Sequence, residues 1–429
     1  MRKIRKIKIE GFWGDKTVDL NFDKEVNFLI GVNGSGKTTI INLIAASLNA
    51  DFATLDKSQF KNIRLDFHET DSEKKGKFET YIEVEKVAKE NSPYSNIILK
   101  IKLPDEVKVK SFLLNELEED SLFRMHDYER IIRIFPGQTR KDVASALKAV
   151  VNVTWLSIHR ISSPNKNNDD KSFESTIDQK IKELSIDLTK YFGVLDRTYS
   201  IETEKFQKNI FLSLIQHAKG ENAVDTDDLE SEKEKDSLRQ IFLLFKLKES
   251  EFSEKLDKHF ANFEKAKDEW ARNRVLATEQ LVHILATRRI HSIVQEWNRL
   301  NEKKININKI KVTFLDEINN LFERKRLFIN DRNELLVETQ SGKVFPLVHL
   351  SSGEKQLLII LGQGLMQENR THIYIADEPE LSLHVEWQEK LVSCLKNVNP
   401  NSQIIFATHS PDIVGKFTNS IIKVESAIA

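Results

Sequence analysis

The chain has 429 residues, of which 40% are hydrophobic and 31% are charged, and its acidic and basic side chains nearly cancel to a net charge of -1. This length allows a sizeable core and two or three domains. The balanced charge supplies no global basic field, so contact with nucleic acid needs a local patch. The longest apolar runs are too short to span a bilayer, and the basic first ten residues precede no apolar signal region, which favours a cytoplasmic protein without a membrane partner.

The first 160 residues have the pattern of a sheet built around a phosphate-binding loop. Apolar and polar side chains alternate in several short segments, and a nearly continuous apolar run enters a glycine-rich loop. We expect a mainly antiparallel sheet beside a nucleotide, followed by a helix and a β-rich return to the core near residue 151. The expected strands are residues 4–10, 17–22, 26–30, 63–67, 78–87 and 95–102, and the expected helices are residues 38–48 and 141–150.

An inserted helical domain is expected in the middle of the chain. Residues 161–171 have the Ser, Pro, Asn and Asp content of a boundary loop. Residues 172–306 then read as long, charged, amphipathic helices of coiled-coil type, interrupted by an acidic polar loop at 220–236. Two helices of about 40 residues each, folded as a hairpin, would be about 60 Å long at a rise of 1.5 Å per residue.

The pattern of the first part resumes after residue 309, where apolar strands alternate with helical segments. Such alternation, with phosphate motifs at strand ends, predicts a parallel sheet covered by helices. The sequence therefore predicts an α/β fold: residues 1–160 and 310–429 form one head, and residues 161–309 form the helical insert.

The loop at residues 31–39, GVNGSGKTT, matches the pattern G-x-x-x-x-G-K-[ST]. In such a loop the glycines let backbone N–H groups turn inward around phosphates, and the N-terminus of the following helix adds partial positive charge. Lys37 is expected to reach the β- and γ-phosphates of ATP, and the Thr38 hydroxyl to join the coordination shell of Mg²⁺. The expected cradle comprises Asn33, Gly34, Ser35, Gly36, Lys37, Thr38 and Thr39.

Polar side chains follow two of the later apolar strands. Asp377 and Glu378 end the segment IYIAD, where Asp377 suits a Mg²⁺ shell and Glu378 suits the general base that polarises the attacking water. His409 ends the segment IIFATH and is placed to hydrogen-bond the γ-phosphate. Two acids at a strand end, or a lone histidine, are more often structural. Their coincidence with a complete phosphate loop favours catalytic roles.

A second phosphate site is expected in the stretch HLSSGEKQ, residues 349–356. Ser351 or Ser352 can cap a helix that begins near Gly353, which leaves free N–H groups and a positive dipole end facing outward. A capped helix start with no ligand is the simpler interpretation of this stretch alone. One nucleotide does not need two cradles, however, so its anion would have to come from elsewhere.

These motifs, in this order, resemble the ABC-type ATPase heads of the SMC, RecF and OLD-like group over roughly residues 1–160 and 310–429. The resemblance implies that Ser351, Ser352, Gly353 and Glu354 grip the γ-phosphate of ATP bound to the opposite copy, which makes the protein a homodimer or higher oligomer through ATP. It also implies a D-loop at residues 380–384, across the dimer seam. Phe12 or Trp13 is a candidate for the adenine contact and Gln59 for the Q-loop, but neither pattern is clear.

The insert and the end of the sequence suggest a biological role. Repair ATPases of this group carry far longer arms that end in a cysteine-pair hook, whereas the only cysteine of this sequence, Cys394, lies outside the insert. OLD nucleases continue after the last motif into an acidic Toprim domain, and no such domain is expected here. The chain most resembles the ATPases of two-gene antiphage systems, above all Septu, which implies a separate nuclease subunit of HNH type; a Toprim partner, as in the PARIS system, is the runner-up. On this interpretation the chain is not itself a nuclease. The alternatives are a DNA-clamping repair ATPase, with DNA as a partner, and a transporter ATPase, whose shorter head lacks such an insert.

Overall fold

The computed structural model describes residues 1–68, 79–87, 95–103, 106, 108–114, 140–156, 176–213 and 230–429. The chain divides into two compact units. The first unit comprises Met1–Thr189 and Ile310–Ala429, and the second comprises Lys190–Lys309. Within the described residues, no helix has both the length and the apolar character needed to cross a membrane.

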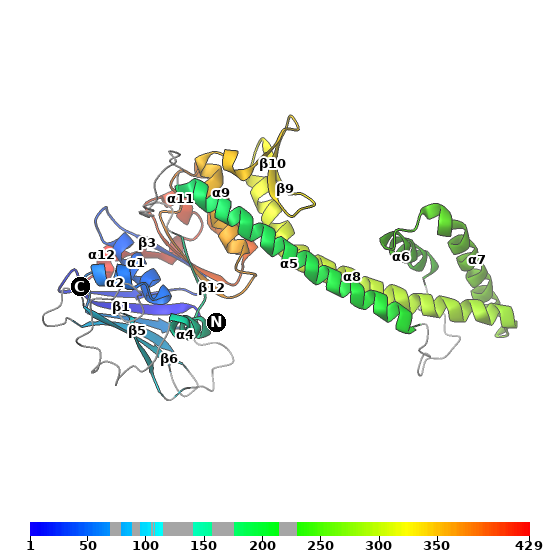
Figure 1. Ribbon diagram of the computed structural model, residues 1–429, viewed down its shortest axis with the longest axis horizontal. Helices are drawn as coiled ribbons and strands as arrows, with labels where there is room; N and C mark the ends of the chain where they lie inside the picture. The colour runs from blue at the N-terminus through cyan, green and yellow to red at the C-terminus, as the bar shows by residue number, and fades with distance from the viewer. Residues whose placement is uncertain are drawn as a thin grey trace, which may run out of the picture. The chain divides into compact units, whose positions relative to one another are not determined.

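A six-stranded antiparallel sheet forms one layer of the first unit, with β1, β5 and β6 visible in Figure 1. Its order is β2-β1-β4-β5-β6-β7. Buried and more exposed residues alternate along its strands, so one face covers the core. The expected strands in this region are confirmed, and β7 is an addition. The strands are β1 (Ile4–Phe12), β2 (Lys16–Asn21), β4 (Asn62–Phe67), β5 (Tyr81–Val87), β6 (Asn96–Lys102) and β7 (Lys110–Leu113).

A five-stranded parallel sheet forms a second layer, in the order β14-β3-β13-β12-β8. Each neighbouring pair in this sheet is parallel. The carboxyl ends of β3, β13 and β12 therefore meet at one edge, where ligands bind in sheets of this kind. The strands are β3 (Val26–Ile30), β8 (Val153–Leu156), β12 (His372–Asp377), β13 (Ser402–Ala407) and β14 (Ile421–Lys423).

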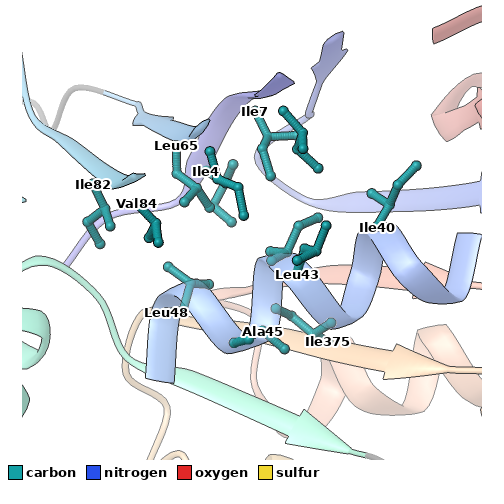
Figure 2. Close-up of a cluster of buried hydrophobic side chains, with 14 of the residues drawn as sticks. Ile4, Ile7, Ile40, Leu43, Ala45, Leu48, Leu65, Ile82, Val84 and Ile375 are labelled. Atoms are coloured by element: carbon teal, nitrogen blue, oxygen red, sulfur yellow. The ribbon is translucent and has the colours of Figure 1, made fainter. Parts of the chain in front are cut away.

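Helix α1 (Lys37–Asn49) lies between the two sheets and fills the core that they share (Figure 2). Leu43 and Leu48 are buried, and they belong to the same cluster as Ile4 and Leu65 of the antiparallel sheet and Ile375 of β12. Every residue of this helix from Leu43 to Leu48 is buried, as such a position requires, because both faces of the helix meet a sheet. This packing fixes the first residue of α1 at the ligand edge of the parallel sheet.

Shorter helices complete this part of the first unit. Helix α4 (Arg140–Val150) confirms the expected helix at 141–150 and precedes β8. The other elements are α2 (Phe52–Lys57), α11 (Pro411–Val414), α12 (Val424–Ala427) and η4 (Thr418–Ser420).

Two longer helices, α9 (Ser352–Leu365) and α10 (Val385–Val398), carry the later motifs. The first turns of α5 (Thr176–Ser213) contact α9, where Lys355 Nζ lies 2.6 Å from Asp178 Oδ1. Cys394 on α10 is buried, as its apolar surroundings in the sequence predict, and burial raises the pKa of its thiol to about 12.

Helix α8 (Thr278–Leu321) continues well past residue 309, where the sequence predicts the end of the insert's helices. Its last turns belong to the first unit and bury Phe314, Ile318 and Leu321 at helical spacing. The helix then leads into a small antiparallel sheet, which the sequence interpretation did not include. This sheet comprises β9 (Lys325–Ile329), β10 (Leu335–Thr339) and β11 (Val344–Pro346), followed by η3 (Leu347–His349).

The second unit is entirely helical within its described residues. Parts of α5 and α8 run antiparallel here, since Lys303 Nζ lies 2.5 Å from Glu202 Oε2 and Asn209 Nδ2 donates to Glu296 at 3.2 Å. The helices α6 (Ser231–Leu244) and α7 (Glu249–Asn273) are additions to the expected hairpin. The four described helices of the second unit share a core that includes Phe206, Leu238, Phe252, Phe260, Phe263 and Trp297.

The prediction of an acidic loop at 220–236 is wrong for residues 231–236, because α6 begins at Ser231. Leu238 and Ile241 bury an apolar side of this helix, and tertiary packing of that side outweighs the local charge. Residues 220–229, and the loop expected at 161–171, lie outside the described residues. The α/β fold with an antiparallel subdomain and a helical insertion is otherwise confirmed.

Candidate active site

The glycine-rich loop connects β3 to α1 in a conformation that glycine favours. Gly34 has φ 81° and Gly36 has φ 95°, which is the left-handed region in which a Cβ is unfavourable. Gly36 is the N-cap of α1, so the helix begins at Lys37. Asn33 and Gly34 are exposed, while Ser35, Thr38 and Thr39 are partly buried. The expected cradle therefore sits at a helix N-terminus, where backbone N–H groups attract anions.

Lys37 is the buried cation of this loop. Its Nζ donates to the carbonyl oxygens of Gly31 at 2.9 Å and Val32 at 3.1 Å. Burial lowers the pKa of the Lys37 ammonium, and the nearby carboxylates of Glu378 and Asp377 oppose that shift. The ammonium is thus folded over the loop beside the acids that end β12.

The end of β12 meets the start of α1 directly. Thr38 Oγ1 donates to Asp377 Oδ1 at 3.2 Å. A hydroxyl and a carboxylate at this separation supply the hard oxygen ligands that Mg²⁺ prefers, alongside phosphate oxygens. The two residues expected to hold the metal are therefore adjacent, and their chemistry fits that ion.

Glu378 has an unusual backbone and faces the end of β13. Its φ is 48°, a left-handed conformation that costs a non-glycine residue free energy and is typically found at functional sites. Its N–H donates to the carbonyl of Ala407 at 2.8 Å. The carboxylate Oε1 lies 3.7 Å from His409 Nε2, and both side chains remain about one-third exposed. The expected base and the expected histidine therefore form a pair that solvent can reach.

Glu380 organises the loop after β13, a role that the sequence did not reveal. Its carboxylate is buried, and Oε1 accepts from the Thr408 hydroxyl and from the backbone N–H groups of His409 at 3.2 Å and Ser410 at 3.3 Å. Burial raises the pKa of this carboxyl, and the hydrogen bonds act in the opposite direction. The sequence signal was present as the third acid of ADEPE, but the D-loop assignment placed it at a dimer seam.

The start of α9 has the capped geometry that its sequence predicts. Ser351 is the N-cap and accepts from the N–H of Glu354 at 3.4 Å, while the carboxylate of Glu354 returns to the N–H of Ser351 at 2.8 Å. Lys325 of β9 donates to both oxygens of Glu354 at 2.9 Å. Glu354 is therefore engaged in orienting the helix start, and Ser352 stands exposed in the first turn.

The beginning of α9 packs tightly against the loop at residues 380–384. A Cβ at Gly353 would lie 2.5 Å from the carbonyl oxygen of Ser382. The backbone of Ser382 is left-handed, with φ 68°. Gln356 Nε2 donates to the carbonyl of Pro379 at 2.8 Å. The start of α9, which is expected to grip the opposite γ-phosphate, is therefore in contact with the expected D-loop.

The two aromatic candidates lie beside the glycine-rich loop. Phe12 and Trp13 are stacked, with ring centroids 4.6 Å apart, and a Cβ at Gly36 would lie 3.0 Å from the Phe12 ring and 3.1 Å from the Trp13 ring. Phe12 is buried, whereas Trp13 is 41% exposed. Trp13 therefore presents an aromatic surface next to the loop. Gln59 is exposed after α2, where no described contact ties it to this site.

The structure brings the loop residues Lys37 and Thr38 together with Asp377, Glu378 and His409. The first turns of α9 contact the loop that follows Glu378, through the hydrogen bond from Gln356 to Pro379. Among the described residues, no hydrogen bond or ion pair joins 351–354 to the glycine-rich loop at 31–39. The capped start of α9 therefore makes no described polar contact with the phosphate loop of its own copy.

The chain matches a known protein family and is similar to curated proteins over part of its length. The sequence pattern of the family described as AAA ATPase domain matches residues 2–414. The Retron Vc95 probable ATPase of Vibrio cholerae serotype O1 biovar El Tor is 27% identical over 180 residues, covering 37% of this chain and 35% of that protein. The Septu protein PtuA of Bacillus thuringiensis is 30% identical over 99 residues, covering 20% of this chain and 24% of that protein.

A repair ATPase and solved head domains are also similar. The DNA double-strand break repair Rad50 ATPase of Saccharolobus solfataricus is 26% identical over 162 residues, covering 36% of this chain and 18% of that protein. The chain therefore spans about a third or less of the length of these relatives. A crystal structure of the Smc head domain with an extended coiled coil, bound to the C-terminal domain of ScpA, from Pyrococcus furiosus, is 16% identical with a TM-score of 0.43, covering 96% of this chain and 91% of that one.

Proposed function

Because the chain belongs to the AAA ATPase domain family, we propose that it binds ATP with Mg²⁺ in the loop at 31–39 and hydrolyses it at a composite site formed by two copies. The observation that carries this proposal is the meeting of three strand ends, where Thr38 lies 3.2 Å from Asp377 and Glu378 lies 3.7 Å from His409 beside the buried Lys37. Phosphoryl transfer depends mainly on positioning and charge stabilisation, and these groups provide both.

Each residue has a role in this proposal that follows from its place. Lys37 neutralises the β- and γ-phosphates, and the backbone N–H groups of the loop hold the phosphate oxygens. Thr38 and Asp377 hold Mg²⁺, which neutralises developing negative charge when bound. Glu378 accepts the proton of the attacking water as general base, and His409 orients this carboxylate and reaches toward the γ-phosphate.

The second half of the composite site comes from the other copy. Ser352 is exposed in the first turn of α9, where backbone N–H groups and the helix dipole favour an anion. Ser351 and Gly353 keep this helix end in place, together with the Glu354–Lys325 pair. In the proposal this end meets the γ-phosphate held by its partner copy, so that ATP joins two heads.

The experiment for this proposal measures self-association of the purified full chain by light scattering. We expect ATP with Mg²⁺ to drive dimerisation and Glu378→Gln to accumulate the ATP-bound dimer, because binding persists while water is no longer activated. Lys37→Ala serves as the binding-deficient comparison and should remain in its nucleotide-free state. Hydrolysis of ATP by a chain that shows no ATP-dependent association at any concentration would contradict the proposal of a composite site.

We further propose that the chain controls a separate nuclease in antiphage defence, with an HNH subunit favoured and a Toprim subunit as the alternative. The similarity to the Septu protein PtuA and to a retron ATPase supports this role. In this division of labour the chain itself does not cut DNA, and the helical second unit, residues 190–309, recruits the partner or builds a higher assembly.

Partner control is tested by co-purification of the chain with the products of neighbouring genes, followed by mass spectrometry and a nuclease assay. Replacing residues 190–309 by a flexible linker should preserve ATP binding and abolish capture of the nuclease. Cleavage of plasmid DNA by the purified chain alone, lost on substitution of its own acids, contradicts the division of labour.

A DNA-clamping repair ATPase is the second candidate, favoured by the similarity to the Rad50 ATPase. A clamp should be retained on closed circular DNA in the presence of ATP without any partner protein. Retention that depends on ATP, together with no captured nuclease, would favour the clamp over the defence role.

A further inference from the structure

Glu425 reaches the glycine-rich loop from a part of the chain that belongs to none of the recognised motifs. Strand β14 pairs in parallel with β3, with Lys423 opposite Ile30. The residues that follow the two strands therefore remain side by side. The N–H of Val32 donates to Glu425 Oε1 at 2.6 Å.

The peptide between Gly31 and Val32 is held at both of its ends. Its N–H group meets the carboxylate of Glu425, and its carbonyl oxygen accepts from Lys37 Nζ at 2.9 Å. A trans peptide is planar, and its N–H and C=O point in opposite directions. Fixing the N–H toward Glu425 therefore aims the carbonyl at Lys37.

The contact is closely fitted. A Cβ at Gly31 would lie 2.5 Å from Glu425 Oε1 and 2.7 Å from Ser35 Oγ, so any other residue at position 31 would displace the carboxylate from its present place. The segment that carries Glu425 is anchored on both sides of it. Val424 is buried, and Ala429 exchanges two backbone hydrogen bonds of 2.9 Å with Thr17 of β2.

We propose that Glu425 is a positioning residue for ATP binding, which orients the Lys37 ammonium through the Gly31–Val32 peptide. The inference rests on the proposed function, because it takes Lys37 as the group that meets the phosphates. Hydrogen bonds from backbone N–H groups, including that of Val32, and the charge of Lys37 lower the pKa of the Glu425 carboxyl. The carboxylate is therefore ionised at neutral pH and is a strong acceptor for the N–H group.

Two other roles for Glu425 make different predictions. If the carboxylate acted only as a negative charge near the phosphates, any neutral replacement would tighten ATP binding. If it only fastened β14 to the sheet, replacements would lower thermal stability and leave ATP affinity unchanged. A positioning role requires an acceptor of the right length, with or without its charge.

The experiment titrates the full chain with a fluorescent ATP analogue and Mg²⁺ and compares three substitutions with the unsubstituted protein. Glu425→Gln keeps an acceptor oxygen at the same distance, so its affinity should stay within about twofold or rise as the negative charge is removed. Glu425→Ala loses the acceptor, and Glu425→Asp withdraws it by one methylene. Both should weaken binding by roughly tenfold, the net value of one hydrogen bond to a charged group.

Ser426→Ala is the matched control, since Ser426 neighbours Glu425, is exposed and donates only to the carbonyl of Lys423 at 2.8 Å among its described contacts. Its affinity should equal that of the unsubstituted protein. Equal affinity of the Ala and Asp variants with the unsubstituted chain overturns the inference, as does tighter binding by Ala and Gln alike. Should the Ala variant unfold, the contrast between Gln and Asp decides the matter. Absence of binding by the unsubstituted protein contradicts the proposed function instead.

Discussion

Glu380 and Thr408 join the loops that follow β12 and β13 through a buried hydrogen bond, in which the Thr408 hydroxyl donates to Glu380 Oε1. The same carboxylate oxygen accepts the N–H of His409 at 3.2 Å. The direction of His409 is thus set by an acid of the neighbouring loop. If the proposed site hydrolyses ATP, its geometry depends on this connection as well as on the residues proposed to meet ATP.

Replacement of Glu380 by alanine should lower kcat for ATP hydrolysis by about 10- to 100-fold with little change in ATP affinity, because His409 loses its support. It should also destabilise the protein by about 1–3 kcal/mol, since buried donors lose their acceptor. Glu380→Gln should largely restore both properties, as burial already disfavours the charged form. The measurement is steady-state hydrolysis with thermal unfolding, and Glu389→Ala on the exposed side of α10 is the control. Loss of affinity with unchanged kcat would contradict the positioning role.

The arginine variant of Ser352 tests the composite site through complementation. Ser352→Arg should leave ATP binding intact and abolish hydrolysis, because a bulky cation blocks the seat of the opposite γ-phosphate. When mixed with Lys37→Ala, which lacks binding, each heterodimer should regain at most one functional site. Hydrolysis is measured over a range of mixing ratios. Failure to complement in heterodimers that demonstrably form removes the main support for action between two copies.

Trp13 is expected to meet the adenine of ATP, since its exposed ring lies beside Gly36. Nucleotide binding should therefore change tryptophan fluorescence, and Trp13→Ala should weaken ATP binding by roughly tenfold, the scale of base–aromatic stacking. Trp13→Phe should keep most of the affinity and lose the fluorescence change. An unaltered fluorescence response in Trp13→Phe assigns the signal to another tryptophan and contradicts this contact.

His372, at the start of β12, should make the protein less stable in mild acid. Burial, with a smaller effect of Arg370, lowers the pKa of this imidazole to about 4. Its unfolded pKa is about 6.5, so the unfolded chain binds more protons between these values, and stability falls as pH decreases through this window. The effect is about 2 kcal/mol at pH 5.

The comparison for His372 uses thermal unfolding of the unsubstituted chain and of His372→Leu at pH 7.5 and pH 5. The variant lacks the titrating group, so its stability relative to the unsubstituted chain should rise as pH decreases. Parallel stability curves for the two proteins contradict a buried, neutral imidazole.

The sequence predicts the part of the site that is local. The glycine-rich loop, the acids Asp377 and Glu378 and a cap at the start of α9 each follow from a few neighbouring residues. The sequence left this cap open between Ser351 and Ser352, and it did not predict the return contact from Glu354. The first and last residues of β3, Val26 and Ile30, were also predicted, because this short apolar run ends at a glycine.

Other parts depend on pairing between distant segments. Glu425 meets Val32 only because β14 aligns beside β3, almost 400 residues away, and no local pattern predicts that register. In the sequence, Glu380 cannot be distinguished from an acid of any surface loop. Its role depends on the folded chain, in which the Thr408 hydroxyl donates to its carboxylate. The extension of α8 to Leu321 likewise depends on tertiary contacts, because Phe314, Ile318 and Leu321 are buried where the helix packs within the first unit.

Gly353 shows how a motif residue can be constrained for reasons apart from ligand chemistry. The carbonyl oxygen of Ser382 stands where any side chain at position 353 would begin, although glycine within a helix costs about 1 kcal/mol relative to alanine. A saturation screen that selects only for a folded, soluble chain should therefore already reject every substitution at this position. A descendant of this sequence that had lost ATP binding would still need this glycine for packing. The presence of glycine at this position is therefore evidence of the packing between two loops and does not by itself indicate catalysis.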